Sequence, residues 1–323
     1  MKTIQYIALV LAVCLTVSVK AQEKRIAFSK GELRICSAKN FEIQGYNGTE
    51  VIIKSLHEKK DANFTYAVRG YARTESDNAS SPSQKGLATT SSENGSVLYY
   101  FGDGERKKGL KKLGKNQENE DLGIYFLIEE KAGELIFKDK VTPEGAFTLY
   151  GGERYLVKVP NSVKINWTTG SCSKDFEQTS AKAPKTRSVF FYDSNPSSIT
   201  DFEGEVEISS TLNNFTLKDV VGPVTINTIG GNVTVEFDKK SPKKIYSIYS
   251  NNGFIDMQIP ENASIAMDVV GKSVYSDVNF AVLSEKEEGE VGHKKTAMNL
   301  KLGSGKVKMK LDASYGTIYL RKQ

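Results

Sequence analysis

The sequence predicts an all-β protein, and three observations support this prediction. A short phrase, a turn residue followed by apolar residues two and four positions later, restarts every nine residues between 204 and 237. Apolar residues two positions apart lie on the same face of a strand. Helical periodicity is weak after residue 21, since the one candidate segment, 104–115, contains internal glycines. We therefore expect each phrase to form one short strand and one turn.

The repeat also predicts which side chains face the core. Its phrases open with Gly or Asn, which tolerate the left-handed backbone of tight turns; these residues are Gly204, Asn213, Gly222 and Gly231. We expect the following side chains to point inward: Val206, Ile208, Val224, Ile226, Val233 and Val235. The same pattern returns after Gly253, Gly305 and Gly316.

Strands in such a rhythm could form an antiparallel meander or the successive faces of a stacked coil. Hairpins favour corners of two residues, whereas the corners between these phrases are longer and variable, such as 209–213 and 218–222. Re-use of one phrase is typical of coils that bury their apolar rows against neighbouring coils. We therefore predict a right-handed β-helix or β-solenoid with short strands and Gly/Asn turns. A β-sandwich is the alternative.

We expect three segments along the chain. Residues 1–21 have a charged start, an apolar middle and a small residue, Ala21, at the expected cut, which is typical of a signal peptide. Residues 22–160 form an N-terminal β region with a long polar loop at about 72–120, and residues 161–323 carry the strand repeats. A second, charged loop is expected at 281–296, where the repeat is interrupted.

The first segment indicates an exported protein, in the periplasm or at the cell surface. A lipoprotein acylated at Cys14 is an alternative interpretation of the same segment. After removal of residues 1–21, Cys36 and Cys172 remain; they could pair in an oxidising compartment or be buried as small apolar residues. No other apolar stretch is long enough to cross a bilayer, so the mature chain is not expected to be transmembrane.

Several segments together resemble the putative-adhesin family of secreted bacterial envelope proteins, a group of unknown function built from β-strand repeats. The resemblance lies in the order of segments that cover most of the mature chain except roughly 72–120. These segments include GELRICSAKNFEIQGYNGTEVIIKS, YLVKVPNSVKINW, GPVTINTIGGNVTVEF and GSGKVKMKLDASYGTIYLRKQ. It implies a β-helix-like fold at the cell envelope. The family offers no catalytic motif to carry over to this chain.

Residues that commonly serve in catalysis or metal binding are scarce. His57 and His293 are the only histidines, and neither has partners at the spacing of a zinc site or a catalytic triad. Glu205 and Glu207 alternate with apolar residues, so we expect them to face solvent rather than to act as a hydrolytic pair. Asp103 lacks the further acidic ligands of a calcium loop. We therefore expect no enzyme activity, cofactor or metal.

Aromatic residues near turns are the candidates for a binding surface. Tyrosine combines apolar contact with a hydroxyl group, which suits recognition of a glycan or a protein. The candidates are Tyr99, Tyr100, Phe101, Phe191, Tyr192 and Tyr249. Of the pair Tyr246 and Tyr249, only one can share a strand face with Ile248.

Three hypotheses about function follow. The first is a non-enzymatic cell-envelope adhesin that presents an extended β surface to a surface glycan or to another envelope protein. The second is a structural or stress-associated envelope scaffold without a free ligand. The third is a polysaccharide-active β-helix enzyme. Nucleic acid is not an expected partner, because the mature chain carries 42 basic and 39 acidic side chains.

The final residues are expected to close the fold. Lys306, Lys308 and Lys310 alternate with apolar residues, and on a terminal strand they would discourage pairing with another chain. We expect Ile318 and Leu320 to be buried, with residues 321–323 in solvent.

Overall fold

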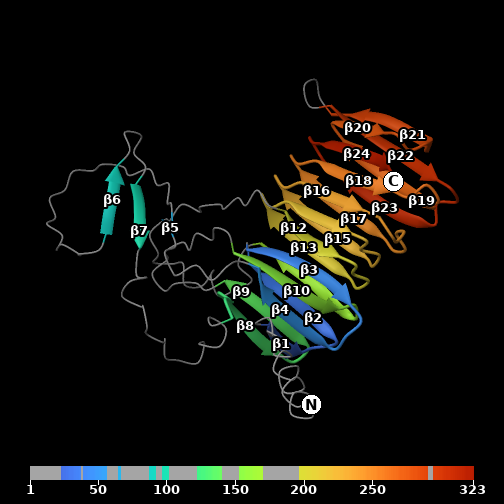
Figure 1. Cartoon of the computed structure of the whole chain (residues 1–323). Coiled ribbons are helices and arrows are strands. Elements are labelled where there is room, and N and C mark those ends of the chain that lie inside the picture. The colour runs from blue at the N-terminus through green and yellow to red at the C-terminus, as the bar shows by residue number, and fades with distance from the viewer. Residues whose placement is uncertain are drawn as a thin grey trace, which may run out of the picture.

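The computed structural model describes the chain in separate ranges. These are residues 23–37, 39–56, 122–139, 153–169, 196–289 and 294–323, together with the backbone of 65–66, 87–91 and 97–101. Within these ranges every regular element is a strand, and the strands form two large mixed sheets and a third, small one. The protein is therefore all-β in its described part (Figure 1).

The first large sheet, sheet A, has ten strands. Their spatial order is β1 (Glu23–Ala27), β4 (Glu50–Ser55), β10 (Arg154–Pro160), β3 (Asn40–Tyr46), β12 (Ser197–Thr200), β14 (Phe215–Lys218), β16 (Val233–Glu236), β18 (Ile255–Ile259), β24 (Thr317–Lys322) and β20 (Ser273–Ser276). From β10 to β20 neighbouring strands are parallel, whereas β1, β4 and β10 pair antiparallel.

The second large sheet, sheet B, has eleven strands. Their spatial order is β21 (Ala281–Glu288), β22 (Lys295–Leu302), β19 (Ile265–Gly271), β23 (Val307–Asp312), β17 (Tyr246–Asn251), β15 (Val224–Ile229), β13 (Val206–Thr211), β11 (Val163–Thr168), β2 (Gly31–Cys36), β9 (Glu134–Asp139) and β8 (Phe126–Lys131). The small sheet contains β5 (Thr65–Tyr66), β7 (Val97–Phe101) and β6 (Leu87–Ser91). Strands β6 and β7 lie within the stretch 72–120.

The nine-residue repeat corresponds to a strict alternation between the two large sheets. From β11 to β20 each strand along the chain belongs to the other sheet than the strand before it. Val206 pairs with Val224, and Phe215 with Val233, both in parallel register and both 18 positions apart. Two phrases therefore return the chain to the same sheet. The antiparallel meander is wrong for these strands, because neighbours in each sheet run parallel.

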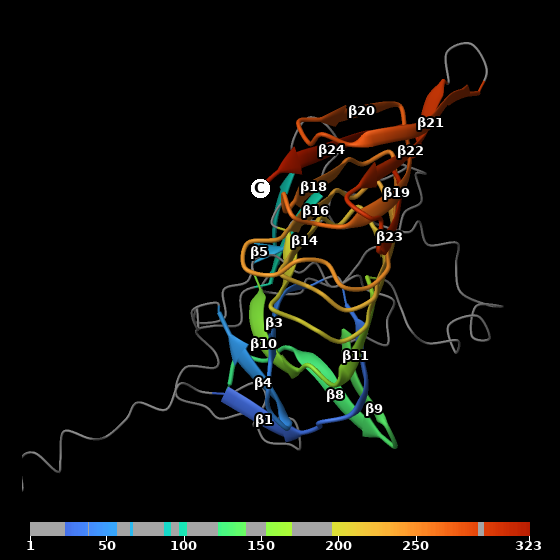
Figure 2. The same ribbon diagram turned by 90° about the vertical axis from the view of Figure 1, so that its right-hand side faces the viewer.

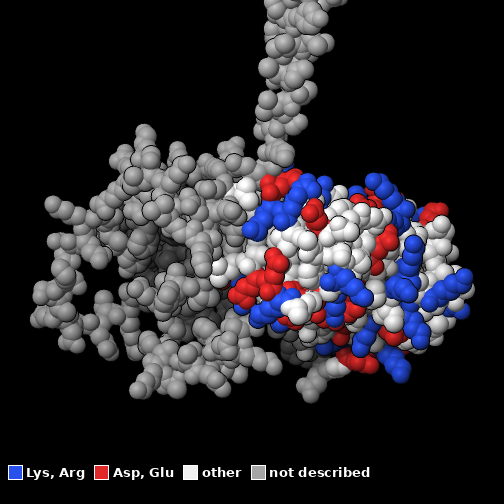
Figure 3. All heavy atoms as spheres, turned by 90° about the horizontal axis from the view of Figure 1, so that it is seen from below, with Lys and Arg blue, Asp and Glu red and all other residues white. Residues whose placement is uncertain are grey.

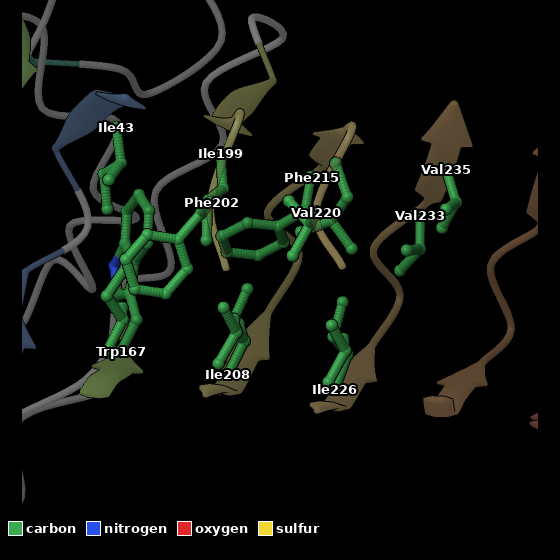
Figure 4. Close-up of a cluster of buried hydrophobic side chains, with 14 of the residues drawn as sticks. Ile43, Trp167, Ile199, Phe202, Ile208, Phe215, Val220, Ile226, Val233 and Val235 are labelled. Carbon is green, nitrogen blue, oxygen red and sulfur yellow. The ribbon is translucent and has the colours of Figure 1, made fainter. Parts of the chain in front are cut away.

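One continuous core lies between sheets A and B (Figure 2). Side chains from the two sheets point toward one another, with Ile199, Phe215 and Val233 facing Trp167, Ile208 and Ile226 (Figure 4). The inward prediction is confirmed, since each of the following is at most 3% exposed: Val206, Ile208, Val224, Ile226, Val233 and Val235. Tyr246 and Ile248 are buried, while Tyr249 on the same strand is exposed, as the strand alternation requires.

At the C-terminal end, the order of the strands along the chain differs from their order in the sheets. β23 lies between β17 and β19, and β24 lies between β18 and β20, so the last two strands are interior strands of their sheets. The expectation that they form a terminal edge is wrong. Ile318 and Leu320 are nevertheless buried, and residues 321–323 are exposed, as expected. The edges at this end are β20 in sheet A and β21 in sheet B.

A tight glycine turn makes this insertion feasible. β22 and β23 pair with opposite sides of β19, so residues 303–306 must pass the start of that strand. Gly303 and Gly305 have φ values of 60° and 74°, which glycine adopts without strain. The backbone N–H of Val307 donates to the Ser264 carbonyl at 2.9 Å and begins the parallel ladder with β19.

The charged stretch 281–296 is a further correction. Instead of a loop throughout, residues 281–288 form strand β21, which pairs antiparallel with β22. All eight residues of β21 are exposed. Backbone hydrogen bonds to an antiparallel partner can hold a strand that has no buried face. Such a strand needs no alternation of apolar and polar residues, so its sequence does not reveal it.

Some sequence predictions fall outside the described residues. These include the signal peptide at 1–21, His57, Asp103, Cys172 and His293. Cys36 is 5% exposed and is disulfide-bonded. Among the described residues, no helix is long and apolar enough to cross a membrane.

Candidate binding site

Three aromatic side chains form a row on the outer face of sheet A, at its C-terminal end. Tyr319 on β24 pairs in register with Asp256 on β18 and with Tyr275 on edge strand β20. Phe254 immediately precedes β18. Tyr275 is 60% exposed and Phe254 36%. Outward-facing aromatic rings of this kind are exposed to solvent, although each could bury a large apolar area against a ligand.

The rings are ordered against each other. Tyr275 and Tyr319 stack with ring centroids 5.8 Å apart and an interplanar angle of 15°. Phe254 meets Tyr319 edge-on, with centroids 6.2 Å apart and an angle of 75°. Both arrangements are favourable for aromatic pairs. We refer to Phe254, Tyr319 and Tyr275 as the aromatic row.

Charged groups flank the aromatic row. The Arg321 guanidinium lies 5.4 Å from the centroid of the Tyr319 ring and donates from Nε to both carboxylate oxygens of Asp256, at 2.8 and 3.0 Å. These hydrogen bonds raise the pKa of Arg321 above its already high usual value, so the group stays charged. Asp277 accepts a hydrogen bond from the Lys322 backbone N–H at 2.6 Å, which fixes a second carboxylate nearby.

A shallow recess lies beside these groups. It has a volume of about 260 Å³ and is lined by Tyr275, Ser276, Asp277, Tyr319, Leu320 and Arg321. Its walls therefore combine two aromatic rings, a hydrogen-bond donor that is always charged, a carboxylate acceptor and a hydroxyl group. Such a set suits a ligand with apolar C–H faces and several hydroxyl groups. We call this site the aromatic recess.

The recess exists because the last strand is inserted. Tyr319 lies between Asp256 and Tyr275 only because β24 separates β18 from β20. Inward-facing Ile318 and Leu320, 0% and 1% exposed, fix Tyr319 in the outward position. The sequence contains this outward signal, but the pairing of three strands from distant parts of the chain is absent from it.

The structure places one predicted site residue clearly. Tyr249 is 36% exposed and lies on β17 of sheet B, so it belongs to the other sheet than the aromatic recess. Tyr99, Tyr100 and Phe101 lie on β7, and their side chains are outside the described residues. Phe191 and Tyr192 also lie outside them. Sequence reasoning missed Phe254, Tyr275, Tyr319 and Arg321.

The strand acids that a hydrolase could use are held in ion pairs. Lys164 Nζ contacts Glu205 at 3.0 Å and Glu207 at 2.9 Å, and both carboxylates are more than 40% exposed. They lie on the outer face of sheet B rather than in the recess. In the described part of the chain, no group of three or more His, Cys, Asp or Glu residues could hold a metal ion.

Comparisons with known proteins give one distant neighbour. No family model matches the chain, and no curated protein matches it. A solved structure of a putative cell adhesion protein from Clostridium sporogenes is similar at 12% sequence identity, with a TM-score of 0.38. The match covers 93% of this chain and 99% of that protein. The resemblance to the putative-adhesin family stays a prediction.

Proposed function

We propose that this protein is an exported, non-catalytic envelope protein that binds a surface saccharide in the aromatic recess. The observation that carries the proposal is the stacked, exposed pair Tyr275 and Tyr319 beside Arg321 and Asp277. A sugar ring can lay its C–H face on an aromatic ring while its hydroxyl groups bond to the flanking charged side chains. The localisation is the periplasm or the cell surface.

The proposal includes a β-solenoid framework. It is supported by the alternation of strands between two sheets and by parallel pairing at a separation of 18 positions. A stacked coil presents its outward side chains in straight rows, because each residue lies above its register partner. Tyr275 and Tyr319 are such register partners, and Phe254 lies two positions before Asp256, the other partner of Tyr319. Adhesion through these rings would need no moving part.

The proposal excludes catalysis on a physical argument. Hydrolysis of a glycosidic bond requires two carboxyl groups placed across the scissile bond. Of the two carboxylates near the recess, Asp277 lines it and accepts a backbone hydrogen bond, whereas Asp256 is outside the lining residues and is engaged by Arg321. Both carboxylates therefore serve to position their neighbours, and the recess is suited to binding.

The test is a glycan array probed with the mature chain, followed by calorimetry with the saccharide that binds. Tyr275→Ala should weaken binding about tenfold or more, equivalent to about 1.4 kcal/mol, because an exposed aromatic anchor is lost. Arg321→Gln should weaken it as well. Tyr249→Ala is the matched control, since Tyr249 is an exposed tyrosine on the other sheet, and it should bind normally. Equal binding by the Tyr275 variant and the parent would refute the site. Absence of any saccharide ligand would favour the scaffold hypothesis.

A further inference from the structure

The lysines of β23, and Lys306 just before it, need a new explanation. Lys306, Lys308 and Lys310 are exposed, whereas Met309 and Leu311 between and beyond them are buried. On an edge strand such lysines would discourage association. β23, however, has β17 on one side and β19 on the other, so it has no free edge to protect.

The register collects further lysines around these three. Lys308 pairs with Ala266 on β19, and Ala266 pairs with Lys301 on β22. Lys308 and Lys301 therefore flank a small side chain on one outward face. Neighbouring strands lie about 4.8 Å apart, and β19 separates β23 from β22, so the Cα atoms of Lys308 and Lys301 are roughly 10 Å from each other. Lys243 and Lys244, both exposed, lie shortly before β17, the other neighbour of β23, with Ile245 between them and the strand.

These charges are not neutralised by ion pairs within the described part of the chain, where none is found for six lysines: Lys243, Lys244, Lys301, Lys306, Lys308 and Lys310. Two carboxylates lie nearby. Asp268 pairs in register with Lys310 and accepts a hydrogen bond from Asn299 at 2.7 Å, and Asp312 accepts one from the Ser314 N–H at 2.8 Å. We call the six lysines the lysine face.

The N-terminal half of the same sheet is different. There Lys164 forms ion pairs with two glutamates, and the Arg34 guanidinium lies 3.6 Å from the carboxylates of both Glu32 and Glu134. In Figure 3 acidic and basic side chains mix over the middle of the drawn face, while basic ones predominate toward the right-hand end, where the C-terminal strands lie. On the face drawn, basic side chains therefore gather toward the C-terminal strands, and such a concentration attracts anionic partners.

We propose that the lysine face binds an acidic polysaccharide, at a site separate from the aromatic recess. Its ammonium groups repeat along β23 at every second residue, roughly 7 Å apart, and across strands at roughly 10 Å, which is on the scale of a disaccharide repeat. A row of polar and charged side chains crosses the same face in register; it consists of Ser247, Lys310, Asp268, Asn299 and Ser284. Ser284 donates a hydrogen bond to Asn299, and Asn299 donates one to Asp268, both at 2.7 Å. The hydroxyl and amide groups of the row keep further donor and acceptor positions, which can bond to sugar hydroxyls.

The test measures binding of the mature chain to polygalacturonate, with uncharged dextran for comparison. The triple variant Lys306→Gln, Lys308→Gln, Lys310→Gln should bind polygalacturonate at least about tenfold more weakly, and its affinity should depend less steeply on salt, because fewer counterions are released. The corresponding triple Lys→Arg variant should retain binding. The control Lys131→Gln, Lys239→Gln, Lys272→Gln removes the same charge from exposed positions elsewhere and should bind like the parent.

Several outcomes would overturn the proposal. Undiminished binding by the β23 variant, or an equal loss in the control, would show that net charge alone is responsible. Tighter binding to phosphatidylglycerol vesicles or to duplex DNA than to polygalacturonate would assign the lysine face to a membrane or to nucleic acid instead. Tyr275→Ala separates the two sites: it should leave polygalacturonate binding unchanged, so that failure of the aromatic recess and failure of the lysine face are distinguishable.

Discussion

The central strands and the C-terminal strands obey the same local pattern but are assembled differently. From β11 to β16 each strand pairs with the strand two elements later in the chain, so chain order equals spatial order in each sheet. From β19 onward the two orders differ. The chain forms β19 and β20, then the antiparallel pair β21 and β22, and only then β23, which lies between β17 and β19, and β24, which lies between β18 and β20. The difference teaches that alternation of side chains determines which face is buried, whereas the order of strands depends on contacts that are distant in sequence.

The largest expected effect comes from removing the inserted strand. Truncation after Ala313 deletes β24 and leaves β18 and β20 without their shared partner. Loss of buried Ile318 and Leu320 alone should cost about 3–6 kcal/mol, a large share of a typical stability of about 5–15 kcal/mol. Denaturant unfolding and limited proteolysis should show a destabilised C-terminal end that aggregates.

The matched deletion tests whether the inserted strand itself matters. Removing only Arg321–Gln323 keeps Ile318 and Leu320 in place, so unfolding should change far less. If the truncation after Ala313 instead unfolds like the parent and stays monomeric, β24 is not the strand that joins β18 to β20, and the comparison between the two regions fails.

The next effect tests the regular region. Val224 is 1% exposed, and its neighbour Thr225 faces solvent. Val224→Asp places a carboxylate in the core and should cost several kcal/mol, whereas Thr225→Asp should stay within about 0.5 kcal/mol of the parent. Urea denaturation measures both. Equal losses would show that the inward and outward positions of β15 are misassigned.

A smaller effect is expected where the regular spacing widens. Register partners are 18 positions apart between β13 and β15 but 22 apart between β15 and β17, because extra residues follow β16. Asp219, 2% exposed, anchors this insertion: its Oδ1 accepts the backbone N–H groups of Asp238, Lys239 and Lys240 at 2.9–3.0 Å. Asp219→Ala leaves these donors without their acceptor and should cost about 1–3 kcal/mol.

The pH dependence of this contribution has a definite sign. Burial alone would raise the pKa of Asp219, but the backbone N–H donors and the Lys218 charge outweigh it, so the pKa is lowered in the folded protein. The stabilisation is therefore present above the unfolded-state pKa, about 3.9, and is lost as pH falls through the lower folded value. The stability gap between the parent and Asp219→Asn should shrink over that acidic range. A gap that is constant with pH would contradict a charge-based role.

The sequence predicted which side chains of each strand point inward better than it predicted which strands lie side by side. The inward positions of β13, β15 and β16 follow from residue alternation, as does the exposure of Tyr249. The insertion of β23 and β24 was not predictable, because Gly303 and Gly305 indicate a tight turn without indicating which strand the turn passes. The aromatic recess was missed for the same reason: Tyr275 and Tyr319 are 44 positions apart, and only the strand order brings their rings together.

Disulfide trapping tests the inserted strand order most directly. Ser247 on β17 pairs with Lys310 on β23, and Lys310 pairs with Asp268 on β19. Adjacent strands place Cα atoms about 4.8 Å apart, within disulfide range, whereas strands two apart are roughly 10 Å away and out of range. The double variant Ser247→Cys, Lys310→Cys should therefore cross-link on oxidation, as detected by peptide mass spectrometry, and Ser247→Cys, Asp268→Cys should not. The reverse result would place β19 directly against β17, in simple chain order, and would contradict the account.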